Sequence, residues 1–436
     1  KDNIRFDIQL KGSGQTPFSR RGDGKCALAP ALREYIMSEA LYALGVPTSR
    51  CLAVVSTGET IHRGLAKAGA VVTRIATSHI RVGSFQYFAS RGDIASLQAL
   101  LDYSIERHYP EINDLETNHR ETHNSKENNV ATSCSQEQRV LLFLQQTIDK
   151  QITLIIQWLR IGFIHGVMNT DNTAICGETI DFGPCAMMGS YHDKAVFSSI
   201  DEYGRYAFGN QGKIAHWNMA RLADCLLPLL YEYQTVADGK NLSSEDKKQA
   251  QQQLALAKVE KIIHRYSSQF DAAYYAMYAN KLGLVDSNEE VNALIDQLLS
   301  IMQSKRMDYT QTFYLLTQAL TDQDKGNTLR NELGSWFDHW LSLFTNSQLG
   351  QQAQALMATN NPVVIPRNHH VEQILARCED ALESSPTQLS AQGSIESIVS
   401  EFLAVLGSPY CEIAATKDYQ DSPVDGDRYY QTFCGT

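Results

Sequence analysis

The hydrophobic pattern of the first part of the chain changes period several times. Apolar and polar residues alternate at 6–11, which predicts a half-buried strand that ends at Lys11. A loop rich in Gly, Ser and Pro follows at 11–25, and 30–44 then carries apolar residues at helical spacing up to a Gly-Val-Pro stop signal. Two further strands are predicted at 51–56 and 70–75. The first 90 residues or so are therefore expected to mix strand and helix.

Helical spacing dominates from about residue 138 onward. The predicted helices lie at 140–159, 216–233, 244–282, 289–304 and 307–321, with shorter ones near 370–384 and 393–406. Residues 108–136 are polar and rich in Asn, Glu and His, and their few apolar residues show almost no helical or strand-like spacing. This stretch is predicted to be an exposed insertion or a poorly ordered loop.

These patterns predict an α+β protein of two lobes. A small α/β N-lobe is expected at 1–107, followed by the polar insertion at 108–136. A larger, mostly helical C-lobe is expected at 137–345, with a C-terminal helical extension and tail at 346–436. A chain of 436 residues exceeds one small core, which agrees with more than one lobe.

Composition narrows the functional classes. The net charge of −11 argues against nucleic acid or an anionic membrane as partner. We find no apolar run near the ~18–20 residues that span a bilayer. Nine cysteines without a Cys-x-x-Cys pair favour a reducing compartment. The expected location is a bacterial cytoplasm, or a mitochondrion if the source is eukaryotic, and a monomer is the expected state.

The candidate chemistry begins with HGVMNTDNTAICGETIDFG at 165–183. Protein kinases carry His-Arg-Asp, then Asn after four residues, and later Asp-Phe-Gly. His165, Asn172 and the triplet Asp181-Phe182-Gly183 fit that pattern, but Val167 stands where the catalytic Asp belongs. The metal and nucleotide groups are thus expected to remain while the chemistry differs.

Nucleotide chemistry needs cations on the phosphates, hard oxygen ligands for a metal and a group that positions the nucleophile. Lys11 ends a strand, and Glu34 lies on the following helix where it can pair with Lys11. Asn172 and Asp181 offer oxygens to Mg²⁺. Asp171 is the nearest carboxylate that could replace the missing base.

Each feature also has a purely structural reading. A lysine at a strand end is commonly a solvated charge, and DFG is a common tripeptide. Residues 169–172 are all turn formers, so they could form a polar turn. Arg74 and Arg81 could be two surface arginines. The order and spacing of the whole set favours the functional reading.

Longer motifs carry a family resemblance. They are LKGSGQTPFSRRGDGKCAL, REYIMSEALYALGVPTSR, TRIATSHIRVGSF, GFIHGVMNTDN, DFGP and GRYAFGNQ, with weaker echoes in RMDYTQTF at 306–313 and in the NP…RNH pattern at 361–369. Together they resemble the SelO family of protein-kinase-like adenylyltransferases. The resemblance implies a kinase-like bilobal fold that binds ATP with the γ-phosphate buried. It also implies AMP transfer to Ser, Thr or Tyr hydroxyls of proteins, with release of pyrophosphate.

The resemblance assigns a role to nine residues. These are Lys11 and Glu34 as an ion pair, Asp23 and Gly24 as nucleotide contacts, Arg74 and Arg81 on the γ-phosphate, Asn172 and Asp181 as Mg²⁺ ligands, and Asp171 as proton acceptor. Mn²⁺ is the alternative metal. Arginine forks suit a buried terminal phosphate, because each presents several donors to anionic oxygens.

The chain also departs from the family pattern. Relatives carry a glycine-rich segment before the strand of the Lys, whereas only ten residues precede Lys11 here, so an exposed sheet edge or apolar surface is expected. Cys434 matches a redox-active position of relatives, but 190–205 contain no Cys to pair with it. Cys185 is a conceivable partner, and a free thiol is the preferred reading. A silent nucleotide-binding scaffold and an ordinary protein kinase remain the alternative functions; Val167 and the two arginines argue against the kinase.

Overall fold

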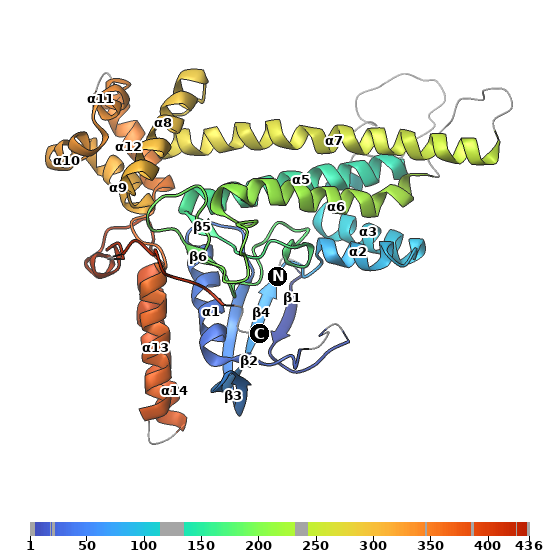
Figure 1. The fold of residues 1–436 in the computed structure, drawn as a ribbon, viewed down its shortest axis with the longest axis horizontal. Coiled ribbons are helices and arrows are strands. Elements are labelled where there is room, and N and C mark those ends of the chain that lie inside the picture. The colour runs from blue at the N-terminus through green and yellow to red at the C-terminus, as the bar shows by residue number, and fades with distance from the viewer. Residues whose placement is uncertain are drawn as a thin grey trace, which may run out of the picture.

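The computed structural model describes residues 5–17, 19, 22–113, 135–231, 243–344, 347–384, 388–423 and 425–433. A small antiparallel sheet lies beside a much larger set of helices, and the segment that contains the kinase-like motif runs between them (Figure 1). The prediction of an α+β protein is therefore confirmed.

The sheet is built around one central strand. Its strands are β1 (Asp7–Lys11), β2 (Cys26–Ala27), β3 (Arg50–Arg63) and β4 (Leu65–Ala76). β4 pairs with β1 and β2 along one side and with β3 along the other, always antiparallel. The strands predicted at 51–56 and 70–75 are correct in place but too short. They extend into a hairpin that turns at Gly64, which has a φ of +78°.

Strand β1 exposes its apolar residues. Ile8 is 66% and Leu10 is 53% exposed, whereas Gln9 and Lys11 point to the partly buried face. Among the described residues β1 pairs with β4 alone, so its other side is an edge. The expectation of an exposed apolar surface here is confirmed. The polar half of the alternating pattern, not the apolar half, faces inward.

Helix α1 (Leu28–Ala43) covers the inner face of this sheet. It begins at Leu28 instead of Pro30 and ends before Gly45, whose φ is +78°. Most of the buried residues of α1 are apolar, but the charged side chain of Glu34 is buried as well. A buried carboxylate needs a charged partner, and the site below supplies it.

The helical part has a long central layer and two flanking groups (Figure 1). The layer consists of α5 (Gln136–Ile161), α6 (Gln211–Leu230) and α7 (Ser244–Lys281). α2 (Val82–Ala89) and α3 (Ile94–His108) pack near α6. At the other end of α7 lie α8 (Glu289–Lys305), α9 (Tyr309–Ala319), α10 (Gln323–Leu333), α11 (Ser335–Ser342) and α12 (Ser347–Asn360).

The C-terminal helices return to the sheet. α13 (Asn368–Ser384) and α14 (Gln388–Leu406) form a hairpin against α1, followed by the short 3₁₀ helix η4 (Ala414–Tyr419). Both helices are longer than predicted. The remaining short elements are β5 (Phe163–Ile164), β6 (Ala186–Met187), η1 (Thr170–Asn172) and η2 (Phe208–Asn210).

The long helices were predicted well because their apolar period is sustained. The sequence reading missed α2, α3, α10, α11 and α12 as separate helices. Most of the predicted insertion at 108–136 lies outside the described residues, because 114–134 are not described. Within the described part of the chain, no helix combines the length and apolar character that crossing a membrane requires.

A lysine is buried where α5, α7 and α9 meet. Lys281 is 1% exposed, donates a hydrogen bond from Nζ to the Arg160 carbonyl at 2.8 Å, and has Nζ 4.2 Å from the centre of the Phe313 ring. Burial, together with the nearby charge of Arg160, lowers the pKa of Lys281 well below the ordinary value of 10.5. The folded state therefore favours the neutral amine.

This burial makes the stability of the protein depend on pH. Between the lowered pKa of the folded state and 10.5, the unfolded chain keeps a proton on Lys281 that the folded chain releases, so the free energy of unfolding rises with pH in that window. We expect Lys281→Met to reduce this rise, by at most about 1.4 kcal/mol per pH unit. Urea unfolding between pH 8 and 10 measures the slope. Exposed Lys247 gives the control, Lys247→Met; equal slopes in the wild type and Lys281→Met would contradict the expectation.

Candidate active site

Four charged residues from three parts of the fold form one cluster. Lys11 at the end of β1 donates from Nζ to Glu34 Oε2 and to Asp181 Oδ1, both at 2.9 Å. Arg74 on β4 donates from Nε to the other oxygen of Glu34, Oε1, at 2.7 Å. The predicted pair of Lys11 and Glu34 is present. Glu34 thus receives two cations, and Lys11 joins it to Asp181.

The register of the sheet explains why these side chains meet. Gln9 lies opposite Arg74, and Lys11 lies opposite Val72. Residues two apart on a strand share a face, so Gln9, Lys11 and Arg74 all point toward α1. Gln9 Oε1 accepts a hydrogen bond from Arg74 Nη1 at 2.9 Å. The sheet therefore presents a polar stripe to the helix that carries Glu34.

One nitrogen of this cluster faces two carboxylates. Arg74 Nη2 is buried and lies 2.5 Å from Glu34 Oε1 and 3.9 Å from Asp181 Oδ1, although it makes no well-directed hydrogen bond to either. Arg74 is 4% exposed and Glu34 is 3% exposed. Arg74 is therefore held in a buried ion pair with Glu34, next to the carboxylate of Asp181.

The opposite charges within the cluster stabilise the ionised form of each side chain. Burial alone would lower the pKa of Lys11, but Asp181 and Glu34 outweigh it and raise the pKa. Burial opposes ionisation of Asp181 as well, yet Lys11 and Arg74 hold its pKa below the usual range. Arg74 and Lys11 likewise lower the pKa of Glu34 against its burial. Both carboxyl groups are therefore ionised at neutral pH.

The backbone around Asp181 is held in an uncommon conformation. Its φ is +68°, the left-handed region that non-glycine residues rarely adopt. His165 anchors the preceding residue by donating from Nε2 to the Ile180 carbonyl at 2.8 Å, while its Nδ1 accepts from Val167 N at 3.3 Å. Burial lowers the pKa of His165, which agrees with a neutral ring in these two roles. His165 thus positions both the motif loop and Asp181.

Asp171 and Asn172 lie together on η1. Asn172 donates from Nδ2 to the Val167 carbonyl at 3.0 Å, which leaves its Oδ1 as the atom that could coordinate a metal. Arg81 reaches the same turn, because its Nη1 donates to the Asp171 carbonyl at 2.8 Å. Burial and the positive charge of Arg74 lower the pKa of Arg81, so the two arginines share one electrostatic environment.

The side chain of Asp171 lies against a glycine. A Cβ at Gly83, near the start of α2, would lie 2.1 Å from Asp171 Oδ1. No residue with a side chain fits there unless Asp171 moves. Gly83 is a positioning residue that the sequence reading missed, since nothing near it in the sequence indicates the distant contact. Asn218 on α6 was missed too; it donates to the Met168 carbonyl at 3.0 Å and to Thr173 Oγ1 at 2.8 Å, which supports the turn.

Asp23 and Gly24 lie in the loop between β1 and β2. Asp23 is bound by Arg63, whose Nη1 and Nη2 donate to its oxygens at 3.0 and 2.8 Å. This ion pair lowers the pKa of Asp23 to about 2. Gly24 has a φ of +68°, and a Cβ there would meet the Gly14 carbonyl oxygen at 2.1 Å. Among the described residues, their contacts thus fix the shape of the loop and do not include the Lys11 cluster.

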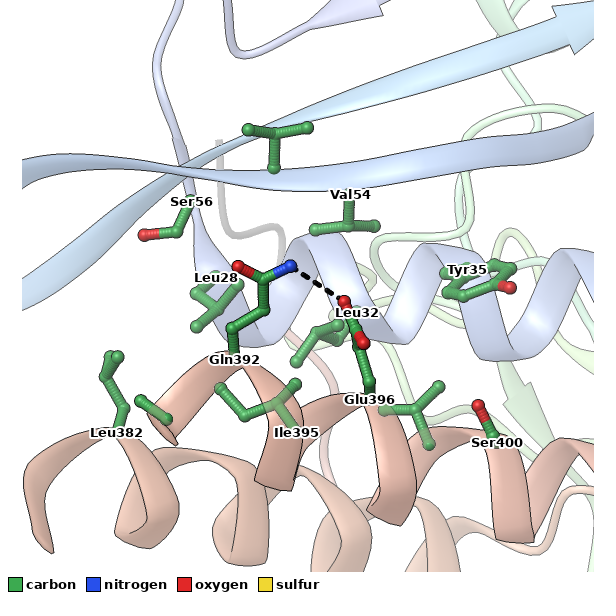
Figure 2. Close-up of a pocket in the computed structure, with 13 residues that line it drawn as sticks. Leu28, Leu32, Tyr35, Val54, Ser56, Leu382, Gln392, Ile395, Glu396 and Ser400 are labelled. Atoms are coloured by element: carbon green, nitrogen blue, oxygen red, sulfur yellow. Dashed lines mark hydrogen bonds between the residues drawn. The ribbon is translucent and has the colours of Figure 1, made fainter. Parts of the chain in front are cut away.

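A separate apolar cavity of about 600 Å³ lies between α1, β3 and α14 (Figure 2). Leu28, Leu32 and Ile395 line it, as do Gln392 and Glu396, which are joined one turn apart along α14 by a 2.8 Å hydrogen bond from Gln392. None of the nine predicted residues lines this cavity. It therefore has no part in the charged site.

Of the two cysteines singled out in the sequence, Cys185 is described by the structure and Cys434 is not. Cys185 is a free, fully buried thiol, and burial raises its pKa to about 12. Such a thiol is unreactive. Cys434 lies outside the described residues.

Comparison with known proteins identifies the family of the chain. The family model of the protein adenylyltransferase SelO matches residues 1–393. Proteins named protein nucleotidyltransferase YdiU are similar to the chain over almost its whole length. The identity is 43% in Teredinibacter turnerae over 99% of this chain and 79% of the relative, 44% in Pseudoalteromonas translucida over 100% and 80%, and 45% in Bacillus cereus over 99% and 78%. The chain therefore belongs to the SelO family of protein adenylyltransferases.

Proposed function

We propose that this protein transfers AMP from ATP to Ser, Thr or Tyr hydroxyl groups of other proteins and releases pyrophosphate. Membership of the family supports ATP-dependent AMP transfer to proteins. The observation that carries the assignment to this site is the ion cluster, in which the cations Lys11 and Arg74 lie 2.9 and 3.9 Å from the ionised Asp181. Two cations beside a possible metal ligand fit the phosphate oxygens of a nucleotide.

The cations have separate parts in this proposal. Arg74 and Arg81 hold the γ-phosphate, and Lys11 contacts the phosphate chain while Glu34 fixes its direction. Arg74 Nε and Nη1 bind Glu34 and Gln9, and Nη2 is paired with Glu34 Oε1 at 2.5 Å, so the phosphate would share Arg74 with Glu34. Asp23 and Gly24 are proposed to contact the nucleotide. The contacts described above hold their loop in one shape. As pyrophosphate leaves, these cations stabilise the charge that develops on it.

A divalent metal fits the same site. Asp181 is held ionised, and Lys11 occupies only its Oδ1, while Asn172 has its amide oxygen available for coordination. Carboxylate and amide oxygens suit Mg²⁺, with Mn²⁺ as the alternative. When bound, the metal would supply charge stabilisation on the phosphates. Asp181 and Asn172 are the residues that would hold it.

Asp171 is the proposed proton acceptor for the substrate hydroxyl. It is exposed on η1, where a protein substrate can approach, and Gly83 leaves space for its carboxylate. Val167 cannot take this role, because its side chain has no group that accepts a proton. Arg81 holds the backbone of Asp171 and thereby links the phosphate contacts to the acceptor.

Further aspects of the proposal concern the whole protein. The sheet with α1 would be the small lobe and the helical part the large lobe of a kinase-like, two-lobed fold, with the domain limits given above. The partners would be ATP and proteins with accessible hydroxyl groups, and not nucleic acid or membranes. A monomer in a bacterial cytoplasm is the proposed state.

Labelled ATP distinguishes the possible activities. We expect label from α-³²P-ATP, and none from γ-³²P-ATP, to become attached to protein in the presence of Mg²⁺. An ordinary kinase would transfer the γ-label instead. A silent scaffold would bind the nucleotide and transfer neither label.

Substitution of the two carboxylates separates their roles. Asp171→Asn should slow AMP transfer by about 10²-fold and leave ATP affinity nearly unchanged, because it removes only a proton acceptor. Asp181→Asn should abolish the metal dependence of ATP binding together with transfer. Exposed Asp224 on α6 gives the matched control, Asp224→Asn. Transfer by Asp171→Asn at the wild-type rate would remove Asp171 from the proposal.

The close contact at Gly83 gives an independent test. Gly83→Ala should slow transfer at least tenfold, since the new methyl group displaces the Asp171 carboxylate by a contact of 2.1 Å. ATP binding and the melting temperature should change little. Gly350→Ala on α12 is the control, because a Cβ there meets nothing within 4 Å. An unchanged rate in Gly83→Ala would show that the position of Asp171 does not limit transfer.

A further inference from the structure

A group of metal-binding side chains lies away from the active site, at the start of α13. His369 and His370 are adjacent in the first turn of this helix, and Asp421 comes from the chain after η4. One potential ligand atom from each residue lies within 4.8 Å of the other two. Among the described residues, no other group of three His, Cys, Asp or Glu meets this criterion.

The geometry brings all three side chains toward one point. His370 Nε2 lies 2.9 Å from Asp421 Oδ1, and His369 Nε2 lies 3.7 Å from Asp421 Oδ2. The two imidazole rings have centres 4.0 Å apart. Two nitrogens and a carboxylate at these separations need only small side-chain rotations to reach one ion at ~2.0–2.2 Å.

An independent observation concerns the bonding of His369. Both of its ring nitrogens are buried and without a hydrogen-bond partner. A neutral imidazole has one donor and one acceptor, so leaving both unsatisfied in a buried place is unfavourable. A metal ion at Nε2 would satisfy the acceptor. His370 is itself 8% exposed, so the site is not a chance surface pair.

The surrounding residues hold Asp421 in place. Gln311 donates from Nε2 to the Gln420 carbonyl at 2.8 Å, and Ser422 Oγ donates to Asp308 Oδ2 at 2.8 Å. The residues on both sides of Asp421 are thus fixed to α9 and its N-cap. Its carboxylate is therefore presented to the two histidines from an ordered segment.

Arg367, a cation close to His369, is already paired with another carboxylate. Arg367 donates from Nη1 and Nη2 to the two oxygens of Asp308 at 2.8 and 3.0 Å. This bidentate pair leaves the charge of Asp421 available to an added cation. The site would hold two neutral imidazoles and one carboxylate, a set with a single negative charge.

We propose that His369, His370 and Asp421 bind one divalent transition-metal ion of the Zn²⁺ class. Imidazole nitrogens select such ions, whereas the oxygen ligands of the active site select Mg²⁺ or Mn²⁺. Three protein ligands leave a fourth position for water. The ion would tie the segment around Asp421 to the start of α13, and α13 packs on the helix that carries Glu34.

Zn²⁺ binding to the whole chain in the presence of excess Mg²⁺ tests the proposal. Isothermal titration should show one Zn²⁺ site, and Co²⁺ in its place should give the visible absorption of a four-coordinate nitrogen and oxygen site. His369→Ala and Asp421→Asn should each weaken Zn²⁺ affinity at least tenfold. Zn²⁺ should raise the melting temperature of the wild type but not of these variants.

Two controls keep the outcome specific. His339 pairs with Glu290 on the surface at 3.5 Å, so His339→Ala removes a comparable histidine and carboxylate pair outside the site. Asp181→Asn removes the active-site carboxylate and should leave the Zn²⁺ site intact. Asp421 is 66% exposed, so Asp421→Asn should fold even if the histidine variants do not. Absence of Zn²⁺ binding, or equal losses in His339→Ala and Asp421→Asn, would overturn the proposal.

Discussion

The site depends on one buried carboxylate. Glu34 accepts from Lys11 on one oxygen and from Arg74 on the other, and it is almost inaccessible to solvent. A buried charge without partners is too costly to keep, so Glu34 requires both cations in place. Because the three residues come from β1, α1 and β4, the same requirement fixes how the sheet and α1 pack. Asp181 is then positioned through Lys11.

The sequence predicted the parts of this arrangement that follow from short-range rules. The pair of Lys11 and Glu34 was predicted because Lys11 ends a strand and Glu34 lies on the next helix. The long helices were predicted because a period of 3.6 residues is clear over many turns. By contrast, β3 and β4 were predicted in the right places but too short. The outer end of β3, at 57–63, is mostly polar, and the outer end of β4, at 65–69, is mostly small residues, so neither shows a clear apolar face. Ile8 and Leu10 of β1 are exposed, because a polar cluster and not a hydrophobic core lies on the inner side of this strand.

Contacts between distant segments could not be predicted. Nothing in the sequence near Gly83 indicates that the Asp171 carboxylate lies against it. The hydrogen bond from Arg81 to the Asp171 carbonyl joins residues 90 positions apart, and no local pattern indicates that these residues meet. The family resemblance named Asp23 as a nucleotide contact, whereas the structure pairs it with Arg63. Local pattern identifies which residues are charged, but the tertiary fold decides which partner each one finds.

The donors of the cluster indicate how the site could accept a nucleotide. Arg74 uses Nε and Nη1 for Glu34 and Gln9, and its Nη2 is paired with Glu34 Oε1 as well. Lys11 has three donors, of which two point to Glu34 and Asp181. Phosphates at the proposed site would therefore share these cations with the two carboxylates. Because the cations are already held in place, little binding energy would be consumed in ordering them. Val167 in place of the kinase base leaves this arrangement intact, because the contacts of the ion cluster do not involve the Val167 side chain.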